Sequence, residues 1–95
     1  MKVFWREHRG GQRMILDTGE EELEIGAFRH TPRGYDALAK TLGYDPGRAQ
    51  KGFPTAEDAK AFVESFKPWD IYVGSAEVQF DRTVYPPLEE KAQSD

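Results

Sequence analysis

The sequence predicts one small α+β domain over residues 1–87, with a mainly antiparallel sheet in the order β-β-β-α-α-β-β and two helices on one face. Strand-like segments separated by glycine-containing turns occupy both ends of the chain, and two capped amphipathic segments lie between them. The 95 residues suffice for one domain with a real core. Residues 88–95, "LEEKAQSD", offer little apolar surface, so we expect a flexible C-terminal tail.

Three strands are expected in the first third of the chain. Residues 3–8, "VFWREH", are rich in β-forming side chains, and Gly10-Gly11 can adopt the positive φ angles of a tight hairpin turn. Residues 12–18 then return as a second strand. After a second turn, residues 22–30, "ELEIGAFRH", alternate with a period of two, which predicts a third antiparallel strand.

The first helix is expected over residues 32–42. Thr31 is a good N-cap, and Pro32 at the first helical position loses no hydrogen bond. An apolar stripe recurs at helical spacing, and Gly43 is a typical C-terminal residue. The stripe consists of Tyr35, Leu38, Ala39 and Leu42.

The second helix, residues 55–67, has the clearest local signals. Thr55 and Asp58 form a capping-box pattern, and Pro68 ends the helix because it displaces the preceding residue from the α region. Its buried stripe is expected to include Phe62, Val63 and Phe66. Two further strands are predicted at 69–73 and 76–82, joined by a turn at Gly74-Ser75.

Composition restricts the classes of function. The chain has no cysteine, which excludes disulfides and thiolate sites, and it has no apolar run of roughly 18 residues that could span a membrane. We therefore expect a cytoplasmic protein with no membrane contact. The net charge of −4 argues against a general polyanion binder. Four basic residues fall within 2–13 and five acidic residues within 17–24, which suits self-association or an intramolecular hairpin better than nucleic acid.

No motif for catalysis, a metal or a cofactor is recognisable. The stretch "GFPTAEDAK" lacks the glycine spacing of a phosphate-binding loop, and His8 and His30 do not have the spacing of metal ligands. We predict no catalytic residue, no metal and no cofactor, and enzymatic activity is not favoured. "GFPTAEDAKAFV", 12 residues, resembles the helix opening of small α+β domains such as the hybrid-binding N-terminal domain of ribonuclease H. The glycine- and tryptophan-patterned strands of that family do not occur upstream, so no function is carried over.

The surface that remains after packing the helices is the predicted functional region. Five strands span roughly 24 Å and two helices cover roughly 20 Å, so the helices cover one face of the sheet only. The second face would carry large apolar groups beside arginines, which predicts a homodimer interface or a site for another protein. The residues of this predicted interaction face are Phe4, Arg6, Arg13, Ile15, Phe28 and Tyr72.

Two alternatives use other features of the same architecture. Aromatic residues beside arginines on an open sheet are similar in kind to sheets that bind single-stranded RNA, although Glu24 would repel phosphate, so nucleic acid is the less favoured partner. The other alternative is a small-ligand or enzymatic pocket between sheet and helices, near Tyr35, Tyr44 and Trp69.

Overall fold

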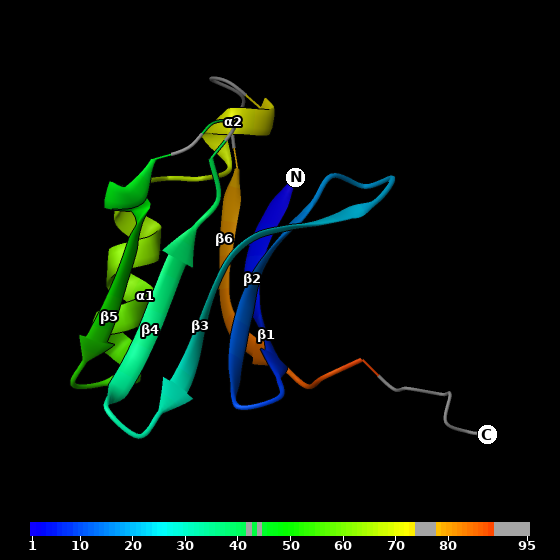
Figure 1. Ribbon diagram of the computed structural model, residues 1–95. Helices are drawn as coiled ribbons and strands as arrows, with labels where there is room; N and C mark the ends of the chain where they lie inside the picture. The colour runs from blue at the N-terminus through cyan, green and yellow to red at the C-terminus, as the bar shows by residue number, and fades with distance from the viewer. Residues whose placement is uncertain (42, 44, 74–77, 89–95) are drawn as a thin grey trace.

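A computed structural model describes residues 1–41, 43, 45–73 and 78–88 (Figure 1). The fold is α+β, as predicted: a mostly antiparallel sheet carries a helix in two pieces on one face. The strands are β1 (Lys2–His8), β2 (Gly11–Asp17), β3 (Glu22–Thr31), β4 (Gly34–Ala39), β5 (Ala49–Phe53) and β6 (Gln79–Tyr85). The helices are a 3₁₀ turn η1 (Pro46–Arg48), α1 (Ala56–Ser65) and the single turn α2 (Asp70–Val73).

The sheet runs in the order β5-β4-β3-β2-β1-β6. Neighbours from β1 to β5 pair antiparallel, so the first five strands form a meander in sequence order. The last strand, β6, instead pairs parallel with β1, with Lys2 opposite Gln79 and Arg6 opposite Tyr85. The two ends of the described chain therefore lie side by side in one sheet.

Helix α1 confirms the prediction made for this segment. The Thr55 hydroxyl accepts a hydrogen bond from the Asp58 amide at 3.1 Å, as an N-cap should. Val63 is fully buried, while Phe62 and Phe66 are part-buried and packed against the core. The helix lies against β3, β4 and β5, behind them in Figure 1.

The predicted helix over 32–42 is wrong, because residues 34–39 form strand β4. The Thr31 hydroxyl donates to the Gly34 carbonyl at 2.9 Å, and Gly34 has φ +123°, so this segment makes a β-hairpin turn where a helix start was expected. The residues also fit a period of two, since Ala37 and Ala39 are buried and Leu38 is exposed. Pairing with strands on both sides outweighs the local helical spacing.

The predicted strand over 69–73 is also wrong, since Asp70–Val73 form helix α2. Pro68 ends α1 as expected, but it also precedes a new helical turn, in which the Val73 amide donates to the Trp69 carbonyl at 3.1 Å. Lys67, with φ +49°, provides the change of direction between the two pieces. The predicted turn at Gly74-Ser75 lies outside the described residues.

A bulge in β3 decides which side chains reach the core. Met14 pairs with Gly26 but Ile15 pairs with Glu24, so β3 contains one extra residue, Ile25. The extra residue shifts the alternation, and Phe28 therefore faces the core, where its ring lies 5.7 Å from that of Trp5. The simple alternation assumed from the sequence placed Phe28 on the opposite face, which the structure corrects.

Gly26, beside this bulge, is where the helix meets the sheet. A Cβ atom at Gly26 would lie 2.6 Å from Cγ1 of Val63 and 3.3 Å from the Leu38 carbonyl oxygen. The helix can approach this closely because position 26 has no side chain.

We expect Gly26→Ala to reduce the free energy of unfolding by about 1–3 kcal/mol, because the added methyl overpacks the contact with buried Val63. Val63→Ala removes the opposing methyl groups and so makes room for the added methyl. The loss of unfolding free energy in the double variant should therefore be about 1 kcal/mol smaller than the sum of the losses in the two single variants. Urea unfolding of the four proteins measures this coupling. Strict additivity would show that the helix does not rest on position 26.

Candidate interaction surface

The face of the sheet turned away from α1, called the outer face below, contains a hollow of about 530 Å³. Strand register places Arg13, Ala27, Leu38 and Ala49 in one row across β2 to β5. Three of these four side chains are apolar and form the floor of the hollow, called the trough below. Polar or charged residues line its rim: His8, Arg9, Arg13, Glu24, Arg29, Asp36 and Lys51.

Small side chains make the trough hollow. Ala27 and Ala49 project only a methyl group from the sheet, and Gly11 projects none. Gly11 is also required by packing, because a Cβ there would lie 2.0 Å from the Phe28 carbonyl oxygen. Leu38 is the exception in this row, and 52% of its surface is exposed. A concave, largely apolar floor is therefore open to solvent.

The trough has an excess of positive charge. Arg13 is paired with Glu24 at 3.1 Å, and the Asp36 carboxylate accepts a hydrogen bond from the Gly52 amide at 3.2 Å. Arg29 and Lys51 form no ion pair with any of the residues that the structure describes. The two acidic groups are thus already partnered, while three cations, Arg9, Arg29 and Lys51, face solvent at the rim.

One polar atom in this region has no hydrogen-bond partner. Gln12 lines the trough, and its Oε1 atom is buried without a donor among the described residues. Buried carbonyl oxygens are normally paired. Gln12 pairs with Phe28 and alternates with Arg13, so its side chain points to the helix side of the sheet and this oxygen is not an acceptor of the trough.

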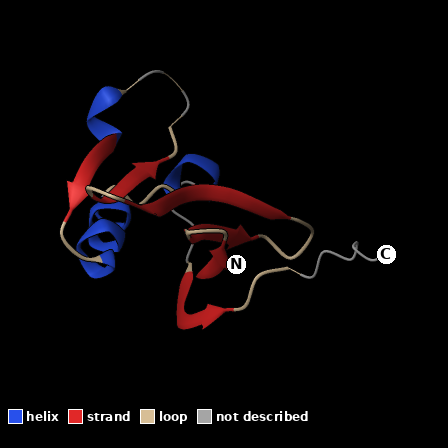
Figure 2. Cartoon of the chain, turned by 60° about the horizontal axis from the view of Figure 1, so that its bottom comes forward, coloured by secondary structure: helices blue, strands red, loops and turns tan. Residues whose placement is uncertain are grey.

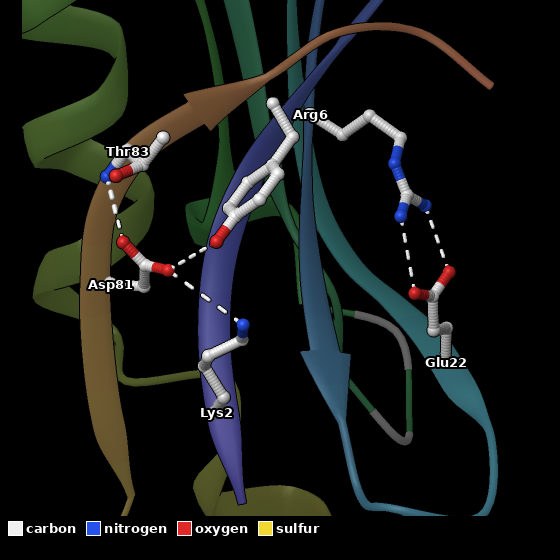
Figure 3. Close-up of polar contacts among 6 residues, drawn as sticks. Lys2, Arg6, Glu22, Asp81 and Thr83 are labelled. Atoms are coloured by element: carbon white, nitrogen blue, oxygen red, sulfur yellow. Dashed lines mark hydrogen bonds and ion pairs between the residues drawn. The ribbon is translucent and has the colours of Figure 1, made fainter.

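A second hollow of about 350 Å³ continues the surface over β1 and β2. Arg6 forms two hydrogen bonds to Glu22, at 2.9 and 3.1 Å (Figure 3). These bonds lower the pKa of Glu22 and raise that of Arg6. His8, Arg9 and Arg13 line both hollows, which makes the outer face continuous from β5 to β1.

The structure places two predicted apolar residues of the interaction face on the outer side but buries them. Phe4 and Ile15 pair directly across β1 and β2, and they are only 3% and 6% exposed. The Tyr85 ring packs edge-on against Phe4 at 4.8 Å, with Lys2 and Arg6 over the same ring of Phe4. β6 and these two basic side chains thus cover the apolar groups that were expected to be exposed.

The other predicted residues separate from one another. Arg6 and Arg13 do line the outer face, whereas Phe28 points to the core and Tyr72 lies on α2. The aromatic pair of the nucleic-acid hypothesis, Phe4 and Tyr72, is therefore not brought together on one open face.

The residues of the predicted sheet–helix pocket do not meet at a described cavity. Tyr35 is on β4 and stacks on His30, while Trp69 packs edge-on against Phe80 near α2. Tyr44 lies outside the described residues. The hollow that the structure contains is on the opposite side of the sheet from α1.

Sequence reasoning missed Leu38, Arg29 and Lys51. Leu38 was missed because β4 was predicted as a helix, and Lys51 because no strand was predicted over β5. Arg29 was overlooked because it follows the bulge in β3. The isolated glycine at position 26 was a usable signal, since a glycine inside a strand pattern often marks a bulge or a close approach.

The carboxylate of Asp81 connects β6 with β1 through a group of polar contacts. Asp81 accepts hydrogen bonds from the Tyr85 hydroxyl at 2.5 Å and from the Thr83 amide at 3.0 Å, and it lies 3.7 Å from Nζ of Lys2 (Figure 3). The Tyr85 and Thr83 hydrogen bonds lower the pKa of Asp81 to about 2.

Within residues 1–41, 43, 45–73 and 78–88, no group of three or more histidine or acidic side chains could hold a metal ion. None of the helices described there is long and apolar enough to cross a membrane. Comparison with known protein families, curated proteins and solved structures finds no match for the chain. A function must therefore be argued from the geometry.

We expect Tyr85→Phe to raise the pKa of Asp81 from about 2 toward its ordinary value of 3.8, because the ionised form loses its strongest hydrogen bond. A depressed folded-state pKa stabilises the fold above the ordinary value, and this contribution disappears as the pH falls toward 2. The variant should therefore lose stability at neutral pH but little at pH 2. NMR titration of the Asp81 carboxyl carbon measures the shift.

Tyr72→Phe is the matched control, since Tyr72 lies on α2 and makes no contact with Asp81. It should leave the Asp81 titration unchanged. An Asp81 pKa that stays near 2 in Tyr85→Phe would show that the Thr83 amide suffices.

Proposed function

We propose that this protein is a small non-catalytic interaction domain that forms a homodimer through the outer face of its sheet. The observation that carries the proposal is Leu38, which is 52% exposed in the middle of a strand, on the apolar floor of the trough. The other large hydrophobic side chains that are more than half exposed in the described chain are Met1 and Leu88, near its ends. An exposed leucine on a concave apolar floor is typical of a buried contact in an assembly.

The edge strands β5 and β6 are irregular and poorly suited to pairing with another chain, which favours a contact through the outer face of the sheet. Pairing between β4 and β5 is interrupted after Tyr35, where the Gly52 amide donates a hydrogen bond to the Asp36 side chain instead of to the backbone of β4. Pairing between β1 and β6 is likewise interrupted after Val3, and the Thr83 amide donates a hydrogen bond to the Asp81 side chain. Irregular edges of this kind oppose the addition of further strands. Face-to-face packing of two sheets remains available and places them about 10 Å apart.

A homodimer fits the chemistry of the surface. A two-fold contact places the same patch of both copies together, so Leu38 of one copy would lie near Leu38 or Ala27 of the other. Burial of these groups provides about 25 cal/mol per Å² of apolar area. A stable interface buries about 1,200–2,000 Å² in total, which requires the rim of the trough to take part as well.

At tens of micromolar, sedimentation equilibrium should give a mass about twice the 10.8 kDa of the chain. Leu38→Glu should raise the dimer dissociation constant by at least about tenfold, because two carboxylates would be buried in the contact. The fold should be retained, since Leu38 already faces solvent in the single chain.

Ala61→Glu is the control, because Ala61 is exposed on α1 away from the outer face. It should leave the dimer intact. A wild-type protein that is monomeric at this concentration would refute the proposal, and a dimer unaffected by Leu38→Glu would place the interface elsewhere.

A further inference from the structure

We propose that the β2–β3 hairpin tip of one copy docks against the trough rim of a second copy, with Glu20 and Glu21 facing Arg29 and Lys51. The tip is residues 17–22. This inference rests on the homodimer proposed above and names the element of the partner that occupies the site. A two-fold axis makes the contact twice, once in each direction.

The tip is held in one shape by its own hydrogen bonds. The Thr18 amide donates to the Glu21 carbonyl at 3.0 Å, and the Thr18 hydroxyl oxygen accepts from the Glu20 and Glu21 amides at 3.3 and 3.2 Å. The Asp17 carboxylate accepts from the Gly19 amide at 2.9 Å. A turn ordered in this way loses little conformational entropy on binding.

The tip also presents charge that its own chain does not neutralise. Glu20 and Glu21 are exposed and form no ion pair within the described part of the chain, whereas Glu22 is held by Arg6. The hairpin extends beyond the other strands in both views of the molecule (Figures 1 and 2). The carboxylates of Glu20 and Glu21 therefore lie at the end of an ordered hairpin that projects from the sheet.

The complementary cations lie at the other end of the same face. Arg29 is opposite Gly11 and Asp36 in the sheet, near the β1–β2 turn, whereas Lys51 lies on the edge strand β5, beyond β4; both line the trough. Gly11 and Asp17 are six residue steps apart along β2, a distance of about 20 Å. The tip cannot reach Arg29 of its own chain, but an antiparallel second copy brings each tip over the other copy's cations.

Charge and shape select this occupant over a nucleic acid. The trough includes Glu24 and Asp36, and the chain has a net charge of −4, so an extended polyanion would meet repulsion. A short tip with two carboxylates can contact Arg29 and Lys51 and leave the acidic side chains to their existing partners.

The test exchanges charges between the two elements. Glu20→Lys/Glu21→Lys and Arg29→Glu/Lys51→Glu should each raise the homodimer dissociation constant by at least about tenfold, because every contact is lost twice and replaced by repulsion. An equimolar mixture of the two variants should form a heterodimer in which both contacts are attractive, since one pairs the wild-type tip with the wild-type rim and the other pairs the two reversed sets of charges. Sedimentation velocity, with one variant labelled by a fluorophore, measures this directly.

A third variant separates position from net charge. Glu57→Lys/Asp70→Lys changes the net charge as the tip variant does, but both residues lie at the starts of helices outside the trough. It should remain a homodimer, and it should not associate with Arg29→Glu/Lys51→Glu more tightly than the wild-type chain does. Circular dichroism and thermal melting confirm that each variant is folded.

The possible results distinguish the two proposals. If the wild-type chain is a monomer, both proposals are refuted. If it is a dimer and Glu20→Lys/Glu21→Lys leaves the dissociation constant unchanged, the tip is not the docking element, although the dimer stands. If the tip and trough variants are each weakened but do not associate when mixed, the charges act on separate contacts and the pairing proposed here is overturned.

Discussion

The close approach of α1 to β3 at Gly26 is the constraint on which the rest of the structure depends. With no side chain at position 26, Val63 reaches the sheet, and the helix settles over β3, β4 and β5. One helix about 10 Å wide cannot also cover β1 and β2. The indole of Trp5 on β1 instead donates to Glu64 at 2.9 Å, and Glu64 also binds Arg82 of β6. The Glu64 carboxylate thus connects α1 to β1 and β6, two strands that the apolar contact at Gly26 does not reach.

The arrangement of the two faces follows from this position. On the helix side, the bulge at Ile25 sends Phe28 inward and adds an aromatic ring to the core. On the outer side, the strands far from the helix bury Phe4 and Ile15 beneath Tyr85, while the strands that carry the helix leave a floor of small residues. The trough is therefore formed by the strands themselves and not by a single loop. It is the reverse side of the part of the sheet that the helix stabilises.

Local signals in the sequence were sufficient where local chemistry decides the structure. Thr55 and Pro68 mark the ends of α1 through interactions with their immediate neighbours, and that helix was predicted closely. Residues 32–42 satisfy two periodicities at once, and only strand partners distant in sequence choose between them. The site depended still more on distant contacts, because one extra residue at Ile25 changes the face of every later side chain in β3. Arg6 and Arg13 were placed on the correct surface, whereas Leu38 could not be recognised while its segment was taken for a helix.

The parallel pairing of β1 with β6 has a consequence for the order of folding. The strands from β1 to β4 can form successively from hairpins with short loops, and β5 follows after the longer connection over residues 40–48. Lys2 of β1, in contrast, can pair with Gln79 only when nearly the whole chain lies between them. Closing so long a loop has a high entropic cost and gives the pairing a high contact order, so it belongs among the slow steps of folding. During synthesis on the ribosome, the free edge of β1 stays unpaired until residues 79–85 have emerged. The nascent chain therefore passes through a stage in which its first strand is open to pairing with other chains.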